Sequence, residues 1–307
     1  MKKKFISKVR KKRRFKYKLL LFVVLFILSV TTTFKTLLKS NIKVSDKNLV
    51  RFLLSDIQYD NNIFKDVFNK VKKNYSPVNL LSTSYYDLVP KKSKKVLNNK
   101  NNDYLIYIYN THQEEKYASS TFVESEVSPS VMMSSYILQD VFNKNSFNTL
   151  VEERSIKEIL NNNNWRYYKS YDASRIYLDD SKSKYPSIKY FIDVHRDSLK
   201  GDKTTIEIGS KKYAKIVFLI GLENKNYKEN LEFTTKINDK LNEKYPNLSK
   251  GIYEKGGDGV NGVYNQDNSK YTILVEIGGV DNTTNEVLNT TLAFSECFME
   301  VISTDEG

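Results

Sequence analysis

Two histidines and two glutamates of this chain have the types and spacing expected of a metal-dependent hydrolase. His112 lies in the segment THQEEKY, where Glu115 follows it by three residues, and His195 is the only other histidine. On a tight loop, this spacing lets His112 and Glu115 reach one ion. Two imidazole nitrogens and one carboxylate make up the ligand set of hydrolytic zinc with an open fourth position.

Glu276 and Arg196 could supply the remaining chemistry of a hydrolase. Glu276 ends the apolar segment YTILVE, and its carboxylate could take a proton from a metal-activated water molecule. Arg196 directly follows His195 and could stabilise the oxyanion of a tetrahedral intermediate. These five residues together predict metal-assisted hydrolysis.

The same residues also have plainer interpretations. A histidine on a loop is commonly a solvated surface residue, and Glu276 could be an edge-strand carboxylate that faces water. Arg196 could form a salt bridge with Asp197 or Asp193. Asp193 either orients a metal ligand from behind or has a structural role inside its strand. The placement of both histidines at strand ends is what favours the metal site.

Apolar runs predict the strands that position these side chains. Residues 104–109 (YLIYIY) and 188–194 (IKYFIDV) are typical of buried strands, and each run is followed by a histidine. Residues 271–276 form a third such strand and end in the glutamate. Because ligands of open α/β sheets bind beyond the carboxyl ends of strands, we expect these loops to meet.

Helical patterns alternate with the strands over residues 104–307. Helices are predicted from Ser128, from the capping box at 155–158, over 173–183 and 227–244, and from the capping box at 283–286. Two further strands are predicted at 204–208 and 214–220. The alternation predicts an α/β domain with a mixed, mostly parallel central sheet flanked by helices.

The amino-acid composition excludes several classes of protein. The 307 residues are 40% hydrophobic and 13% aromatic, which excludes wholesale disorder. The single cysteine, Cys297, excludes an intrachain disulfide and a cysteine-based zinc finger. Residues 1–18 hold eight lysines and three arginines, so removing these 11 charges from the net +13 leaves +2 elsewhere. The basic charge is therefore a local tail, which argues against nucleic-acid binding.

The segment after the basic tail predicts a membrane anchor. Residues 19–34 carry no charge, which is short against the roughly 20 residues of a bilayer span and long for a signal-peptide core of about 7–15. The cations before it favour an uncleaved, single-pass transmembrane signal anchor, with the catalytic domain on the extracytoplasmic side of the cell membrane. A cleaved signal peptide and a buried helix are the alternatives. Residues 35–103 are polar and predict a linker or N-terminal extracytoplasmic region.

Several segments of the chain resemble the stage II sporulation protein P family. They run in order from about Tyr104 to Ile302 and comprise IYIYNTHQEEKY, KYFIDVHRDS, KIVFLIGLENKNY, LSKGIYEK, GVYNQD and LVEIGGVDNT. The motif T-H-x-x-E-x-Y is met by Thr111, His112, Glu115 and Tyr117, H-R-D by residues 195–197, and E-x-G-G by Glu276, Gly278 and Gly279.

The chain departs from the family pattern at a few positions. Gln113 and Glu114 replace the small polar residues expected after the first histidine, and Lys250 stands where arginine is expected. Because Glu114 adjoins Glu115, the carboxylate ligand is open between them, and Glu124 or Glu126 could also reach the metal.

The resemblance implies a membrane-anchored peptidoglycan hydrolase with a zinc amidase-like fold. Its expected activity is that of a zinc (Zn2+)-dependent N-acetylmuramoyl-L-alanine amidase, with an additional ability to cut peptide crosslinks. Expected partners are the stage II sporulation proteins D and M, with which family members act during engulfment. The segment at 264–267 is a candidate substrate wall, through Tyr264, Asn265 and Gln266, or else an ordinary loop rich in turn formers.

Two other functions fit the same residues. A zinc carboxypeptidase-like enzyme uses the same arrangement of a His-x-x-Glu motif, a distant histidine and a late glutamate. A wall-binding protein without turnover could keep the fold, although the presence of all four expected site residues argues against it.

Overall fold

The computed structural model describes residues 45–47, 49–50, 103–118, 120–122, 125–127 and 129–305. The predicted basic tail, the signal anchor at 19–34 and nearly all of the region at 35–103 lie outside the described residues. In the part of the chain that is described, no helix combines the length and the apolar character needed to cross a bilayer.

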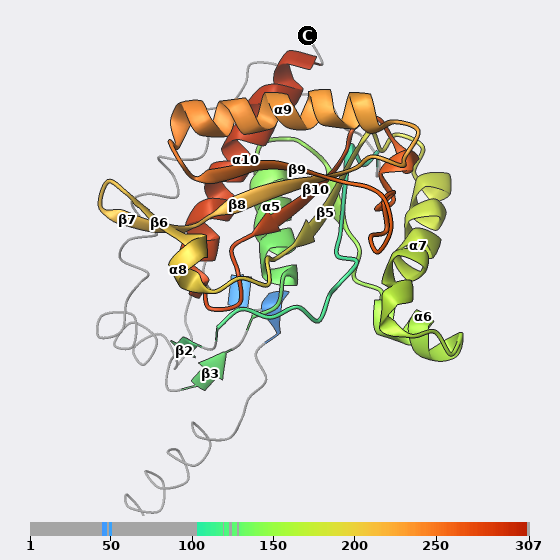
Figure 1. Ribbon diagram of the computed structural model, residues 1–307, viewed down its shortest axis with the longest axis horizontal. Helices are drawn as coiled ribbons and strands as arrows, with labels where there is room; N and C mark the ends of the chain where they lie inside the picture. The colour runs from blue at the N-terminus through green and yellow to red at the C-terminus, as the bar shows by residue number, and fades with distance from the viewer. Residues whose placement is uncertain are drawn as a thin grey trace, which may run out of the picture. The chain divides into compact units, whose positions relative to one another are not determined.

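The predicted mixed, mostly parallel sheet is confirmed (Figure 1). In spatial order its strands are β4 (Thr149–Val151), β1 (Ile106–Tyr109), β5 (Tyr190–His195), β10 (Thr272–Ile277), β8 (Ile216–Gly221) and β9 (Ser249–Lys255). The first four strands are parallel to one another, whereas β8 pairs antiparallel with β10 and parallel with β9.

Helices cover both faces of this sheet. The helices are α5 (Met132–Lys144), α6 (Ile156–Asn162), α7 (Ser170–Lys184), α8 (Gly201–Thr204), α9 (Tyr227–Lys244) and α10 (Thr284–Asp305), with 3-10 turns η1 (Tyr167–Lys169) and η2 (Gln266–Asn268). Helices α5 and α9 each pack on α10, and the three helices cover one face of the sheet. Helix α7 packs on the opposite face, where Leu178 contacts Tyr107 and Phe191.

Two of the predicted helix starts have the expected caps. The Ser155 hydroxyl accepts a hydrogen bond from the Glu158 amide at 3.2 Å, at the start of α6. At the start of α10, Thr283 and Glu286 form a reciprocal pair, with the Thr283 amide donating to the Glu286 carboxylate at 2.9 Å. These side chains satisfy amide groups that a helix start leaves without partners. Helix α5, predicted from Ser128, begins at Met132 instead.

The strand predicted at 214–220 is present as β8 (Ile216–Gly221), but it begins two residues later than predicted. The chain breaks at Lys215, whose amide donates to Thr204 and whose carbonyl accepts from the turn after β10. Before the break, β6 (Thr205–Ile208) and β7 (Lys211–Ala214) form a separate two-stranded sheet. The apolar patterning of the sequence predicted neither β4 nor β9. Strands β2 (Ser120–Phe122) and β3 (Ser125–Val127) pair with each other.

Phe298 of α10 is the centre of the core on the three-helix face. Its fully buried ring lies within 6.0 Å, centroid to centroid, of Phe142, Tyr190, Phe233 and Phe294. These rings come from α5, β5, α9 and α10 itself, so one side chain joins the helices to the sheet.

Replacing Phe298 by alanine is expected to lower the free energy of unfolding by about 3–5 kcal/mol, because it leaves a cavity where four aromatic rings meet. Urea unfolding of the full chain followed by circular dichroism measures the change. The control is Ile176→Ala on α7, a side chain that is 44% exposed and should change stability by less than about 0.5 kcal/mol. Equal losses in the two variants would contradict this account of the core.

Candidate metal centre

The register of three parallel strands brings the candidate side chains to one edge of the sheet. Strand β1 ends one residue before Asn110, and its Tyr109 lies beside Asp193 of β5. On the other side of β5, His195 lies beside Glu276 of β10. Because side chains alternate between the faces of a strand, Asp193, His195 and Glu276 project to the face that α7 covers.

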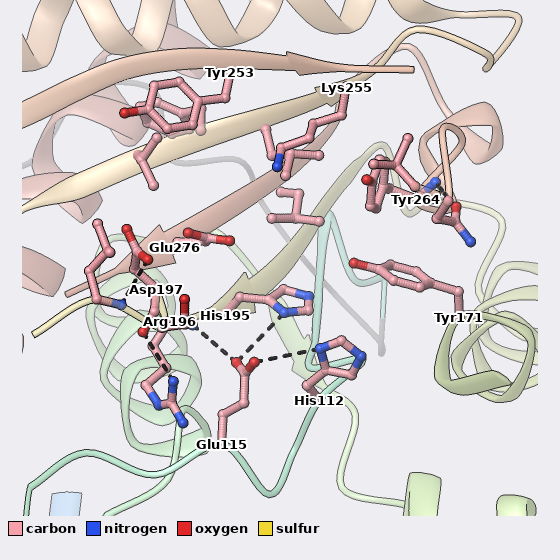
Figure 2. Close-up of a pocket in the computed structure, with 18 of the residues that line it drawn as sticks. His112, Glu115, Tyr171, His195, Arg196, Asp197, Tyr253, Lys255, Tyr264 and Glu276 are labelled. Atoms are coloured by element: carbon pink, nitrogen blue, oxygen red, sulfur yellow. Dashed lines mark hydrogen bonds and ion pairs between the residues drawn. The ribbon is translucent and has the colours of Figure 1, made fainter. Parts of the chain in front are cut away.

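His112, Glu115 and His195 converge at this edge (Figure 2). The Glu115 carboxylate lies between the imidazoles, with Oε1 3.5 Å from Nδ1 of His112 and Oε2 3.7 Å from Nδ1 of His195. One nitrogen or oxygen from each side chain lies within 4.8 Å of the others. Two nitrogens and one carboxylate at this spacing are chemically suited to hold a zinc ion.

Asp193 lies directly behind the His195 ring. The Asp193 Oδ1 atom lies 3.0 Å from Nε2 of His195, which leaves Nδ1 facing Glu115. The Asp193 carboxylate is fully buried and accepts hydrogen bonds from the Thr111 amide at 2.9 Å and the Thr111 hydroxyl at 2.7 Å. A carboxylate behind a histidine is the support that metal-binding imidazoles commonly have.

Arg196 holds the loop that carries Glu115. Its amide donates to Oε2 of Glu115 at 3.1 Å. Its guanidinium donates to the backbone carbonyl of Lys116 at 2.7 Å and to that of Asp197 at 3.0 Å. These contacts are to backbone carbonyls, so the predicted salt bridge to Asp197 or Asp193 is not formed. The role of Arg196 in stabilising an oxyanion stays a prediction.

Neighbouring charges shift the pKa values of two of the candidate ligands. Burial lowers the pKa of His195, but the nearby carboxylates, Asp193 foremost, outweigh burial and raise it to about 9. Burial raises the pKa of Glu115, yet hydrogen bonding by His112 and the charge of His195 prevail and lower it. Both shifts have the same cause, which is the attraction between the imidazoles and the carboxylates that surround them.

Glu276 lies beside this cluster without a partner of its own. Among the described residues, its carboxylate forms no hydrogen bond or ion pair, and Figure 2 shows it directed into the cavity near His195. Burial raises the pKa of Glu276, and the negative charges of Asp197 and Glu115 raise it further. A free carboxyl with a raised pKa is suited to accept and return a proton.

The cluster forms the floor of a cavity of about 820 Å³. Tyr264 lines this cavity, as the sequence predicted, and its ring packs edge-on to Tyr171 at 5.3 Å. Asn265 and Gln266 do not line it, so this part of the prediction is corrected. Asn265 is buried and donates to the Tyr171 carbonyl at 3.0 Å, and Gln266 is buried against Leu219. Internal hydrogen bonds occupy both amides.

The geometry distinguishes among the candidate carboxylate ligands. Glu114 points away from the cluster and pairs with Lys157 at 2.9 Å, with 64% of its side chain exposed. Glu124 lies outside the described residues, as does the side chain of Glu126. Glu115 is the carboxylate that reaches both histidines.

Sequence reasoning missed the side chains that surround the cluster. Tyr167 stacks on His112 with ring centroids 4.9 Å apart, and Tyr171 lies edge-on to the same imidazole. Across the cavity, Lys250 of β9 pairs with Asp197 at 2.7 Å. The tyrosine-rich segment at 165–172 was the available signal for the two tyrosines, and the segment LSKGIYEK was the signal for Lys250.

The turn at 278–279, after β10, requires glycine twice. Gly278 has φ of 68°, in the left-handed region. A Cβ atom on Gly279 would lie 2.1 Å from the Leu199 carbonyl oxygen. The Gly278 carbonyl accepts a hydrogen bond from the Asp197 amide at 2.7 Å, so this turn positions the loop that follows β5.

Comparison with known families gives one match that covers most of the chain. The family model described as Stage II sporulation protein P matches residues 34–299. The Stage II sporulation protein P of Bacillus subtilis (strain 168) is 33% identical over 205 residues, which are 64% of this chain and 51% of that protein. The chain therefore spans about half the length of this curated relative.

Two solved structures have a limited similarity of fold. The CwlD amidase from Clostridioides difficile in complex with the GerS lipoprotein matches with a TM-score of 0.43 and 12% identity, over 66% of this chain and all of that chain. Cwp6 from Clostridium difficile matches with a TM-score of 0.39 and 12% identity, over 66% of this chain and 29% of that chain.

Replacing Gly279 by alanine is expected to lower the free energy of unfolding by about 2 kcal/mol, because the new Cβ would collide with the Leu199 carbonyl. Thermal and urea unfolding of the full chain measure the change. The matched control is Gly201→Ala, where the nearest atom to a new Cβ lies 3.6 Å away and stability should rise by at most about 0.5 kcal/mol. A Gly279→Ala protein as stable as this control would show that the turn can open.

Proposed function

The chain belongs to the stage II sporulation protein P family, and we propose that it is a zinc-dependent N-acetylmuramoyl-L-alanine amidase that hydrolyses peptidoglycan. The observation that carries this proposal is the convergence of His112, Glu115 and His195 within 4.8 Å, with the unpartnered Glu276 beside them. Three ligands with an open fourth side and a nearby general base are the components of a hydrolytic zinc site.

In the proposed site, His112, Glu115 and His195 hold the metal, and Asp193 keeps the ring of His195 in its binding orientation. Zinc bound there would polarise the lactyl amide carbonyl and acidify the attacking water molecule. The cavity above these residues leaves room for a large substrate on the open side of the cluster.

Glu276 moves the proton in the proposed reaction. Its carboxylate accepts a proton as the water oxygen adds to the lactyl carbonyl carbon. It then returns that proton to the alanine nitrogen as the carbon–nitrogen bond breaks, which leaves a lactyl carboxylate and a free amine. Arg196 positions the metal ligand Glu115 in this scheme, because its amide donates to the Glu115 carboxylate and its guanidinium donates to the Lys116 carbonyl.

The family and the sequence-predicted anchor at 19–34 extend the proposal to location and partners. We assign the enzyme to the outer side of the cell membrane, in sporulation and engulfment, with the stage II sporulation proteins D and M as partners. Cutting of peptide crosslinks is a second activity of the same proposal, at the same metal site.

The products of digestion test the proposed reaction directly. Purified sacculi incubated with the full chain and zinc should release intact stem peptides that begin with a free L-alanine amine. Release of single amino acids would instead identify a carboxypeptidase-like enzyme, and binding without soluble products would identify a wall-binding protein.

Zinc binding is expected to depend on Glu115 but not on its neighbour. Glu115→Gln should weaken zinc affinity by more than about 100-fold, because loss of a supporting residue alone costs 10- to 100-fold. Glu114→Gln is the matched control and should bind zinc like the wild type, because this exposed side chain pairs with Lys157. Isothermal titration calorimetry on metal-stripped protein measures both. Equal affinities in the two variants would remove Glu115 from the ligand set.

Glu276→Gln is expected to reduce kcat by about 10²- to 10⁴-fold while leaving zinc affinity unchanged, because it removes proton transfer but no ligand. Release of stem peptides from sacculi gives the rate, and metal analysis gives the zinc content. Glu254→Gln, an exposed glutamate on the neighbouring β9, is the control and should keep full activity. A fully active Glu276→Gln enzyme would assign the general base elsewhere.

A further inference from the structure

We propose that the cavity binds the two halves of its substrate on different walls, with sugar rings on Tyr167 and Tyr168 and the acidic stem peptide along β9 at Lys255. This inference rests on the amidase function proposed above and specifies how the same site orients its substrate. It assigns specificity to side chains outside the metal cluster.

Exposed apolar side chains gather around this one cavity. Among the described residues, every exposed large apolar side chain lines it except Ile176 and Leu222. Tyr168 and Tyr167 are the most exposed of them, at 74% and 58%. Exposed apolar groups concentrated in a groove mark a binding surface, because water contact is costly for them unless a ligand covers them.

Tyr167 is held at the edge of the metal cluster. Its ring stacks on His112, with centroids 4.9 Å apart and planes inclined by 22°, and Tyr168 follows it in η1. Of the two nearby cations, Lys169 is paired with Asp172 at 2.9 Å, and Arg166 does not line the cavity. This wall therefore offers aromatic rings rather than uncompensated charge, which suits the uncharged, partly apolar faces of sugar rings.

The opposite wall offers a free cation. Figure 2 shows Tyr253 and Lys255 on β9, across the cavity from His112 and Glu115. Lys250 on the same strand also lines the cavity, but its charge is compensated by Asp197. The ammonium group of Lys255, by contrast, has no acidic partner among the residues that the structure describes.

The chemistry of the proposed substrate decides which half binds which wall. The scissile amide joins a lactyl group on an uncharged sugar to a peptide that carries carboxylates. An enzyme that cleaves it must hold sugar on one side of the reacting carbon and an acidic chain on the other. Complementary charge assigns the peptide to Lys255 and the sugar to Tyr167 and Tyr168.

Binding of two ligands that lack the scissile amide tests this arrangement without depending on catalysis. The ligands are glycan strands stripped of peptide and free stem peptides, titrated against the full chain by fluorescence or calorimetry. Tyr168→Ala should weaken glycan binding about tenfold and leave peptide binding unchanged. Lys255→Met should weaken peptide binding about tenfold and leave glycan binding unchanged.

Controls separate the two walls from general effects on folding. Ile176→Ala and Lys228→Met, exposed residues outside the cavity, should bind both ligands like the wild type. A stem peptide with amidated carboxylates should bind the wild type and Lys255→Met equally. Three results would overturn the assignment. One variant could lose binding of both ligands, the two variants could each lose the ligand assigned to the other wall, or neither variant could change binding of either ligand.

The same binding data distinguish this inference from the amidase proposal. If Tyr168→Ala loses only glycan binding and Lys255→Met loses only peptide binding, the two walls are supported even when sacculi release no stem peptide. In that case only the catalytic proposal fails. In the opposite case, the protein cleaves sacculi but its Tyr168→Ala and Lys255→Met variants bind both ligands normally. That result would overturn the wall assignment and leave the amidase proposal intact.

Discussion

The buried carboxylate of Asp193 is the constraint on which the geometry of the site depends. It lies inside β5 with no exposed surface, where an uncompensated charge would be strongly destabilising. Its oxygens accept two hydrogen bonds from Thr111 and face Nε2 of His195. Because Thr111 directly precedes His112, a single carboxylate fixes both histidine-bearing segments. The requirement to satisfy one buried charge thus sets the distance between the two imidazoles.

Strand direction explains why the remaining residues meet at the same place. Strands β1, β5 and β10 are parallel, so the segments after β1 and β5 and the end of β10 share one edge of the sheet. Strand β8 runs the other way, and its first residues therefore lie at that edge, with Val217 beside Glu276. Strand β9 follows the direction of β8, which places Lys250 near its start within reach of Asp197. One antiparallel pairing therefore supplies the second wall of the cavity.

The sequence predicted those parts of the fold that rest on apolar patterning. Strands β1, β5 and β10 were found because they are buried on both faces and form continuous apolar runs, and helix α9 was found because its buried positions repeat with the helical period. Strand β9 was missed because an edge strand with exposed residues has no apolar run. Asn265 and Gln266 were misassigned because their types suggest a solvated loop. Tyr264 and Asn265 both adopt positive φ, however, and the amides turn inward to bind backbone carbonyls. Side-chain hydrogen bonding of this kind leaves no periodic signal.

Charge couples the proposed metal to the proposed substrate. Lys250 compensates Asp197, which leaves the carboxylates of Glu115, Asp193 and Glu276 around a single buried histidine. These three carboxylates outnumber the positive charges of His195 and Arg196, so the floor of the cavity is negative and would repel an acidic peptide that approaches along β9. A divalent cation between Glu115 and the imidazoles offsets this charge and removes the repulsion. The ion that activates the amide would therefore also admit the charged half of the substrate, so metal and peptide should favour one another's binding.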